Sequence, residues 1–437
     1  MEKKYFIVTY GCQMNVHESE KLAGILRRRG YAAAACAEEA DVVVFNTCCI
    51  RENAENHAYG NIGALKKLKR SRPGLLIAVG GCMTQQEGAA ERLHKKLPFV
   101  DIVFGTHNLY KFGELLDKKA GQKKALLSVE GQGREPEEDI AFRTSYPNAW
   151  VNIMYGCNNF CTYCIVPYVR GRERSRDPEA VLAEVRGLLD EGYKEITLLG
   201  QNVNSYGTDR DVGMNFPQLL RRICEDGRKF RLRFMTSNPK DFGEELVRAV
   251  AECPQLCRLV HLPAQSGSDR ILRLMNRKYT AEEYLKKVEM LRKYVPGCAL
   301  TSDLMVGFPT ETEEDFRRTL ELVEAASFSA AFTFVYSRRS GTKAAAMDGQ
   351  VPEEVCKERI MRLVEAVNAQ TRRLSEGYAG KTVEILCEDR DEKRGLWMGR
   401  DEFGRMGYFA DEADPVGQFV NVRVKDTSGI SLFGERV

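Results

Sequence analysis

The sequence lacks the features that would indicate a membrane protein or an unfolded chain. Its first residues lead directly into the short apolar stretch 6–8, which is far too brief for a signal-peptide core or a membrane span. It contains no internal repeat and no low-complexity tract. Hydrophobic residues make up 43% and charged residues 29% of its 437 residues, a mixture typical of soluble globular proteins. We therefore expect a cytoplasmic protein.

An excess of charge of one sign is also missing. The chain has 65 Lys and Arg against 62 Asp and Glu, and the net charge of +3 is too weak to identify a nucleic-acid partner by itself. Basic residues do cluster locally, in segments 66–72, 170–176 and 228–233. Because such clusters usually form a solvated face, each needs further evidence before it indicates a binding surface.

The pattern of apolar residues changes along the chain and predicts an α/β protein of three domains. Residues 3–118 alternate short apolar runs with amphipathic segments, as in a small parallel α/β domain. Residues 119–145 carry glycine and proline among charges, so we expect a linker. Residues 146–376 alternate six strands with helices, which predicts a partial (β/α)6 barrel that ends in a long helix. Residues 377–437 have the short alternating strands of a small all-β barrel.

The expected strands lie at 5–9, 42–46, 75–80 and 100–104 in the first domain, at 151–154, 195–199, 230–235, 259–262, 300–306 and 330–336 in the central barrel, and at 382–387, 397–400, 405–408 and 418–424 in the last domain.

Cysteine is plentiful, and its spacing is the strongest signal in the sequence. The chain has 14 cysteines, and because the cytosol keeps thiols reduced, metal or redox chemistry is favoured over disulfides. Cys157, Cys161 and Cys164 form a Cys-x3-Cys-x2-Cys motif directly after the first expected barrel strand. Three thiolates so spaced can bind three corners of a 4Fe-4S cluster and leave the fourth iron open. Strand ends are also where catalytic groups of (β/α) barrels gather.

Three further cysteines each follow an expected strand of the first domain. These are Cys12, Cys48 and Cys82. The carboxyl ends of parallel strands share one rim of a sheet, so the three thiols can meet there and hold a second cluster. Cys49 neighbours Cys48, and only one of two adjacent side chains is expected to point into the same site; we choose Cys48, with Cys49 as the alternative.

The remaining cysteines are scattered. Cys253 and Cys257 have a helical spacing that suits a metal pair, but no third cysteine is near them in the sequence. Buried small apolar side chains account best for these residues.

Segments in the first two domains resemble the methylthiotransferases of the radical S-adenosylmethionine superfamily. They are residues 10–15, 46–48, 80–83, 156–167, 170–172, 198–204, 234–237, 261–269, 275–277, 306–309 and 311–313. The resemblance runs nearly from end to end, and the segment after Cys12 is similar to the members that act on isopentenylated adenosine in tRNA. Cys49 departs from the family pattern, in which a small polar residue is expected.

The resemblance implies a mechanism with two 4Fe-4S clusters and S-adenosyl-L-methionine as cofactors. The cluster on Cys157, Cys161 and Cys164 would bind S-adenosylmethionine and cleave it, and the resulting 5′-deoxyadenosyl radical would take hydrogen from C2 of the adenine, which acid–base chemistry cannot activate. The auxiliary cluster on Cys12, Cys48 and Cys82 would supply the sulfur. The residues expected to contact S-adenosylmethionine are Gly200, Gln201, Asn202 and Gln265.

The implied substrate is a tRNA that carries N6-isopentenyladenosine beside the anticodon. Arg170, Arg172 and Arg174 follow the cysteine motif and are candidates for contact with its backbone. Residues 377–437 resemble the TRAM domain, an RNA-binding module, although nine Lys and Arg face twelve Asp and Glu there. RNA binding there would need a local basic patch, for which the candidates are Arg400, Arg405 and Arg423. The aromatic residues Trp397, Tyr408 and Phe409 would then be stacking surfaces for bases. Alternatively, these aromatic residues belong to the core of the domain.

Two alternatives remain open. A sister methylthiotransferase would act on threonylcarbamoyl-adenosine in tRNA or on a ribosomal-protein aspartate, and a protein of another class would be a non-catalytic iron–sulfur RNA-binding or electron-transfer protein. The expected partners of the main hypothesis are an electron donor such as flavodoxin or ferredoxin and a sulfur donor. We expect a monomer without membrane contact.

Overall fold

A computed structural model shows the fold of residues 2–49, 52–131, 141–209 and 212–437. The chain divides into two compact units. The first comprises Met1–Thr144, Tyr155–Asn158 and Ile165–Arg176, and the second comprises Ser145–Met154, Asn159–Cys164 and Asp177–Val437. Two short segments that follow the first strand of the predicted barrel domain, 146–376, belong to the first unit. The domain bounds remain predictions.

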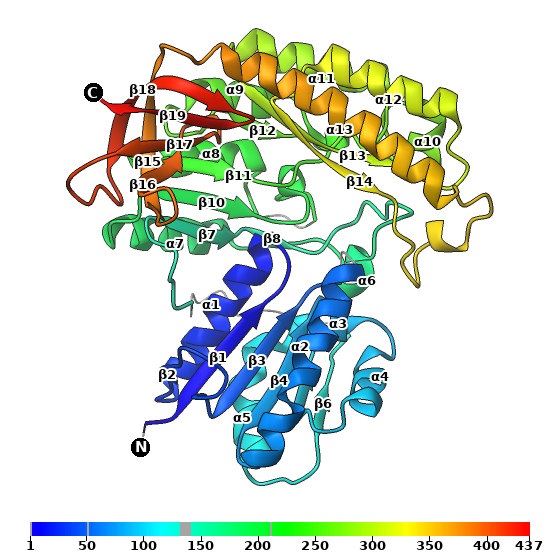
Figure 1. Ribbon diagram of the computed structural model, residues 1–437, viewed down its shortest axis with the longest axis vertical. Helices are drawn as coiled ribbons and strands as arrows, with labels where there is room; N and C mark the ends of the chain where they lie inside the picture. The colour runs from blue at the N-terminus through cyan, green and yellow to red at the C-terminus, as the bar shows by residue number, and fades with distance from the viewer. Residues whose placement is uncertain (1, 50–51, 132–140, 210–211) are drawn as a thin grey trace. The chain divides into compact units, whose positions relative to one another are not determined.

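The first unit contains a six-stranded parallel sheet in the order β2-β1-β3-β4-β5-β6 (Figure 1). Its strands are β1 (Lys4–Thr9), β2 (Ala32–Ala33), β3 (Val42–Thr47), β4 (Leu76–Gly81), β5 (Ile102–Phe104) and β6 (Leu126–Ser128). Its helices are α1 (Gln13–Arg28), α2 (Glu52–Ser71), α3 (Cys82–Gln85), α4 (Ala89–Lys96), η1 (Thr106–Lys111) and α5 (Phe112–Ala120). The expected small parallel α/β domain is confirmed.

Helices cover both faces of this sheet, which is why its central strands are apolar on both sides. On one face Leu22 and Leu26 of α1 and Leu116 of α5 pack with Val44 of β3. On the other face helices α2, α3 and α4 pack against β3, β4 and β5. All six residues of β3 are buried, so this strand forms the centre of the sheet.

The linker expected at 119–145 is wrong over its first part. Helix α5 ends at Ala120, and β6 pairs with β5 as the sixth strand of the sheet. Further on, the Phe142 amide donates a hydrogen bond to the Glu20 carbonyl at 2.9 Å. A strand of three residues is too short for its alternation to be read against the surrounding charges. Residues 132–140 lie outside the described residues.

The second unit begins with six parallel strands in two three-stranded sheets, with the orders β11-β10-β7 and β12-β13-β14. The strands are β7 (Asn148–Asn152), β10 (Glu195–Leu199), β11 (Arg231–Phe234), β12 (Leu259–His261), β13 (Ala299–Val306) and β14 (Ala330–Val335). These match the six expected strands. The short elements β8 (Met154–Tyr155), α6 (Val166–Arg170) and β9 (Arg174–Ser175) follow β7.

The helices between these strands start at strong caps. The Thr280 and Thr312 side chains form capping boxes at the first turns of α11 and α12, and Asp177 caps α7 ahead of Pro178. The helices are α7 (Pro178–Asp190), η2 (Val203–Ser205), α8 (Phe216–Cys224), η3 (Pro239–Asp241), α9 (Glu244–Glu252), α10 (Asp269–Leu274), α11 (Ala281–Tyr294), α12 (Glu313–Ala326), η4 (Ala344–Ala346) and α13 (Glu353–Glu376).

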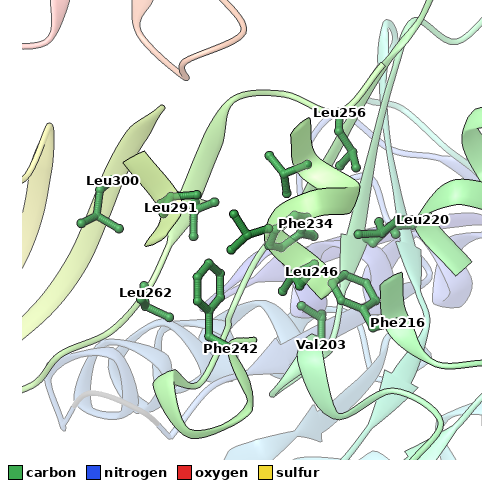
Figure 2. Packing of buried hydrophobic residues seen from close by; sticks show 14 of the residues in the cluster. Val203, Phe216, Leu220, Phe234, Phe242, Leu246, Leu256, Leu262, Leu291 and Leu300 are labelled. Carbon is green, nitrogen blue, oxygen red and sulfur yellow. The ribbon is translucent and has the colours of Figure 1, made fainter. Parts of the chain in front are cut away.

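The core of this unit lies between the strands and their helices. Figure 2 shows part of it, including Phe216 and Leu220 of α8, Phe234 of β11, Leu246 of α9 and Phe242. The Phe216 and Phe234 rings meet edge to face with centroids 5.3 Å apart. All of these side chains are buried, so the strands that carry the predicted site residues pack on a continuous apolar core.

The C-terminal segment is a closed barrel of five strands in the order β15-β16-β17-β19-β18. The strands are β15 (Thr382–Asp391), β16 (Leu396–Arg400), β17 (Met406–Ala410), β18 (Phe419–Ser428) and β19 (Ser431–Arg436). Its centre holds Ile385, Phe409 and Val422. The expected all-β barrel is confirmed, although it packs in the same unit as the central strands.

Two arginines of the basic segment 228–233 are not on a solvated face. Arg231 is buried and donates hydrogen bonds to the carbonyls of Arg400 and Glu384, the second at 2.7 Å. Arg233 is also buried and donates to the Asp401 carbonyl at 2.5 Å. These bonds join β11 to the C-terminal barrel.

Arg231→Leu is expected to lower the free energy of unfolding by about 1–3 kcal/mol, since it removes the donor for two carbonyls. Denaturant unfolding followed by tryptophan fluorescence measures this, because Trp397, one of two tryptophans, packs against the core of the C-terminal barrel. The control is Arg228→Leu, because Arg228 is exposed and pairs with Asp190 and Asp226. Equal destabilisation by the two variants would contradict the assignment.

Candidate metal centres

Three cysteines of the first unit lie at the carboxyl ends of neighbouring strands. Cys12 precedes α1 directly after β1, Cys48 follows β3, and Cys82 is the first residue of α3 after β4. Strand β3 pairs with both β1 and β4, so the expectation that these strand ends share one rim is confirmed. The strand order also reverses between β1 and β3, which is where α/β sheets form a binding crevice.

Two glycines bring the cysteine loops together. Gly11 has φ +119°, and a Cβ atom there would lie 2.7 Å from Cys48 Cβ and 3.0 Å from its Sγ. Gly81 has φ +101°, and a Cβ atom there would lie 2.3 Å from the Thr47 carbonyl oxygen. Only glycine fits such approaches at positive φ. The loops that carry Cys12 and Cys82 therefore both close on the end of β3.

The two adjacent cysteines have different neighbours. Cys48 lies against Gly11, whereas Cys49 forms a hydrogen bond with Cys82. That bond and burial raise the pKa of the Cys49 thiol well above its usual range, and the same bond lowers the pKa of Cys82 to about 7. The choice of Cys48 as the ligand remains a prediction.

Arg170 needs a correction, because it is buried in the first unit and does not face solvent. Its guanidinium makes a two-pronged ion pair with Glu18, at 2.6 and 3.1 Å, and donates to Asn15 Oδ1 at 3.0 Å. Its charge also acts on the Cys82 thiol, whose pKa is lowered first by Cys49 and further by Arg170. A guanidinium so occupied cannot bind a tRNA phosphate. Arg172 is exposed and Arg174 is half-buried, so both stay candidates.

The Cys-x3-Cys-x2-Cys loop runs from one unit into the other. Its three cysteines are half-buried. The Cys157 amide donates to the Gly171 carbonyl at 3.1 Å within the first unit, and in the second unit the Cys164 amide donates to the Cys161 carbonyl at 3.0 Å. The loop is therefore folded back on itself around Cys161 and Cys164.

A segment after α10 holds this loop in the second unit. Asn276, at φ +59°, donates hydrogen bonds to the carbonyls of Asn159 at 3.1 Å and Phe160 at 3.0 Å. Thr162 in turn donates from Oγ1 to the Leu274 carbonyl at 2.8 Å. The loop conformation is thus fixed by residues more than a hundred positions later in the chain.

Arg277 in that segment contacts a cysteine of the motif. Its Nη1 lies 3.3 Å from Cys161 Sγ, its Nη2 donates to the Pro263 carbonyl at 2.8 Å, and its Nε donates to Tyr279 Oη at 2.8 Å. Arg277 was not among the residues predicted to act at the site. In the sequence it stands out only as the last residue of segment 275–277, which resembles the family.

The donor chemistry of both loops fits iron–sulfur clusters. Each set of loops offers three thiols as metal ligands, and each has a buried arginine beside a thiol, namely Arg170 at Cys82 and Arg277 at Cys161. Clusters held by thiolates are anionic, and a neighbouring guanidinium suits them. Within the described residues, no three His, Cys, Asp or Glu side chains are already arranged as metal ligands, so the six cysteines remain predicted ligands.

The glycine predicted to approach S-adenosylmethionine has a packing role. Gly200 follows β10, and a Cβ atom there would lie 2.6 Å from Met154 Cγ. Any larger side chain would displace that buried methionine, so packing also favours glycine here. Gln201, beside it, is half-buried.

Two other predicted cofactor contacts lie at strand ends of the second unit. Asn202 is buried and donates to Asp241 Oδ2 at 2.8 Å, while its own Oδ1 has no hydrogen-bond partner in the described structure. Gln265 has φ +69°, and its amide donates to the Asp303 carbonyl at 2.8 Å. The unsatisfied Oδ1 of Asn202 fits a polar ligand. Both contacts remain predictions.

Two of the expected RNA-contacting residues of the C-terminal barrel are structural. Phe409 is fully buried in the barrel core. Arg405 is buried and donates to Ser375 Oγ at 2.8 Å. Tyr408 instead stacks on Phe433, with ring centroids 5.0 Å apart. Arg400, Arg423 and Trp397 are at least partly exposed and stay candidates.

In the part of the chain that the structure describes, no helix is both long and apolar enough to cross a membrane.

Comparison with family models matches all three parts of the chain. Residues 4–105 match an uncharacterized protein family, UPF0004, residues 151–323 match the Radical SAM superfamily, and residues 376–437 match the TRAM domain. Among solved structures, the radical S-adenosylmethionine methyltransferase TsrM from Kitasatospora setae covers 79% of this chain and 77% of its own, with TM-score 0.58 and 14% identity. At that identity the likeness shows the fold alone.

Curated relatives align over almost the whole sequence. The tRNA-2-methylthio-N(6)-dimethylallyladenosine synthase of Clostridium botulinum is 49% identical over 99% of this chain and 97% of its own length. The protein of the same name from Acetivibrio thermocellus is 48% identical over 100% of this chain and 91% of its own. The chain therefore belongs to the family of tRNA-2-methylthio-N(6)-dimethylallyladenosine synthases.

Proposed function

We propose that this protein adds a methylthio group to C2 of N6-isopentenyladenosine beside the anticodon of tRNA, by radical S-adenosylmethionine chemistry. The observation that carries the proposal is the 49% identity to a synthase of that name over 99% of the chain. The geometry supports it, because two separate thiol sets lie at strand ends of two α/β folds.

The two thiol sets would serve two steps. Cys157, Cys161 and Cys164 would hold a cluster that supplies the electron for cleavage of S-adenosylmethionine. Cys12, Cys48 and Cys82 would hold the auxiliary cluster that delivers sulfur. Gly200, Gln201, Asn202 and Gln265 would contact S-adenosylmethionine, and the missing side chain of Gly200 would permit a close approach.

The partners follow from this chemistry. The substrate is a tRNA that carries isopentenyladenosine, and exposed Arg172 with half-buried Arg174 would contact its backbone. A low-potential carrier such as flavodoxin or ferredoxin would supply electrons, and a separate sulfur donor would restore the auxiliary cluster.

The test is anaerobic incubation of the reconstituted protein with S-adenosylmethionine, a reductant and isopentenylated tRNA, followed by mass spectrometry of the digested nucleosides. We expect a mass gain of one methylthio group on isopentenyladenosine. The product should vanish with Cys157→Ala and with Cys12→Ala, and persist with Cys298→Ala, which lies outside both thiol sets.

Two other results would change the assignment. Modification of threonylcarbamoyl-adenosine tRNA alone would move the substrate to that of the sister enzymes. The absence of 5′-deoxyadenosine with every substrate would exclude the radical mechanism, and would favour an electron carrier or a non-catalytic RNA-binding protein.

A further inference from the structure

Arg277 is a buried cation without a carboxylate partner. In the part of the chain that the structure describes, it forms no ion pair with any Asp or Glu side chain. Its three hydrogen-bonding nitrogens contact the Pro263 carbonyl, the Tyr279 hydroxyl and Cys161 Sγ. Of these groups, only the cysteine sulfur becomes an anion at neutral pH when it binds a metal.

A charge in this position is costly unless it is neutralised. Buried charges in proteins are paired or hydrogen-bonded to groups of opposite sign, because desolvation of an unpaired ion is strongly unfavourable. By comparison, the buried Arg359 pairs with Glu311 at 2.9 Å, and the buried Arg233 pairs with Glu195 at 2.9 Å. Arg277 lacks such a partner and touches a thiol instead.

The backbone around Arg277 is fixed, so the contact is not accidental. Four hydrogen bonds join residues 274–276 to the loop 159–162, two of them from Asn276 and two from Thr162. They set the distance between Arg277 and Cys161 independently of the side chain of either residue. The backbone hydrogen bonds therefore place the Arg277 guanidinium beside the Cys161 sulfur.

We propose that Arg277 is a positioning residue that holds the Cys161 sulfur as a cluster ligand and raises the reduction potential of the cluster by donating a hydrogen bond to that sulfur. This inference rests on the proposed function, because it assumes a cluster on Cys157, Cys161 and Cys164. Reduction adds negative charge to the cluster, and a nearby cation with an N–H donor stabilises the reduced form more than the oxidised form.

The test measures the midpoint potential of this cluster in the full-length chain. The auxiliary ligands Cys12, Cys48 and Cys82 are replaced by alanine so that one cluster remains, and its reduction is followed by electron paramagnetic resonance. Arg277→Gln is expected to lower the ratio of reduced to oxidised cluster about tenfold at a fixed solution potential, or ~59 mV for one electron. Arg277→Lys, which keeps the charge but loses the planar fork, should lie between it and the wild type.

Arg273→Gln is the matched control, since Arg273 is exposed, is four residues away and donates to the Asp269 carbonyl. It should leave the potential unchanged. Equal potentials for the wild type and R277Q would overturn the inference, as would an equal shift in R273Q. If R277Q holds no cluster, the midpoint potential of R277K is compared with that of the wild type. Equal potentials for these two proteins would then overturn the inference.

The proposed function fails in a different way. If the chain with Arg277 intact and Cys157, Cys161 and Cys164 present binds no iron, or binds iron without cleaving S-adenosylmethionine, the proposed function is wrong. If it does both and its potential does not depend on Arg277, only the role of Arg277 is wrong.

Discussion

If the protein holds the two proposed clusters, with about eight iron atoms, Cys48→Ala is expected to remove about four of them and to abolish methylthio transfer, whereas Cys49→Ala should retain both. The reason is the packing at the end of β3. The loop that carries Cys12 closes on Cys48 through Gly11, and the loop that carries Cys82 closes on the backbone just before Cys48. Both partner loops therefore close on the end of β3, and the loop of Cys12 contacts Cys48 itself.

Cys49 has different neighbours from Cys48. It is buried with Cys82, Ile165 and Val169, and the hydrogen bond to Cys82 together with burial raises the pKa of its thiol well above the usual range. Cys48 instead lies against Gly11, in the loop that carries Cys12. Because only one of two adjacent side chains is expected to point into the same site, we expect Cys49 to pack beside the predicted auxiliary site without being a ligand.

Iron and sulfide analysis of the anaerobically reconstituted variants measures this difference, together with the yield of 5′-deoxyadenosine. C48A should still form 5′-deoxyadenosine, because Cys157, Cys161 and Cys164 are intact, and should form no methylthio product. The reverse result, with iron lost from C49A and kept by C48A, would make Cys49 the ligand.

The placement of the cysteines could be predicted because it depends on secondary structure. Apolar runs located β1, β3 and β4, and parallel strands must share a rim, so Cys12, Cys48 and Cys82 had to lie along one edge. The six barrel strands followed from the same alternation. Strands β2 and β6, with two and three residues, are too short to produce a readable pattern.

The roles of the arginines could not be predicted in this way. Arg170 and Arg231 stand in basic segments that resemble solvated faces, and their burial depends on partners far away in sequence, Glu18 and Glu384. Arg277 depends on a loop whose Cys161 precedes it by 116 residues. The residues next to a charged side chain in the sequence do not show whether the tertiary structure buries it.

The aromatic residues of the C-terminal barrel show a different limit. Phe409 and Tyr408 are adjacent in β17, so they point to opposite sides of the strand. The sequence indicates the alternation but leaves open which of the two is inside. Packing around Ile385 and Val422 decides that Phe409 fills the core.

The second large effect is expected at the Glu18–Arg170 pair. Arg170→Met should lower the free energy of unfolding by about 3–5 kcal/mol, because it leaves the buried Glu18 carboxylate without its partner. Glu18→Met should lower the free energy of unfolding by a similar amount, since it removes the carboxylate partner of the buried guanidinium. The double variant, in which both charges are removed, should recover much of this loss, because apolar pairs of similar volume often replace buried ion pairs at little cost.

Urea unfolding of the full-length chain, followed by far-UV circular dichroism, gives the three values, and Arg172→Met is the control for an exposed arginine nearby. These stabilities, together with tRNA affinities, distinguish a structural role of Arg170 in the basic segment 170–176 from a role in tRNA binding. If Arg170 served tRNA, its replacement would weaken tRNA binding and leave stability unchanged. Because its guanidinium bonds to Glu18 and Asn15 within the first unit, we expect the opposite for Arg170, and a loss of tRNA affinity without a loss of stability for Arg172.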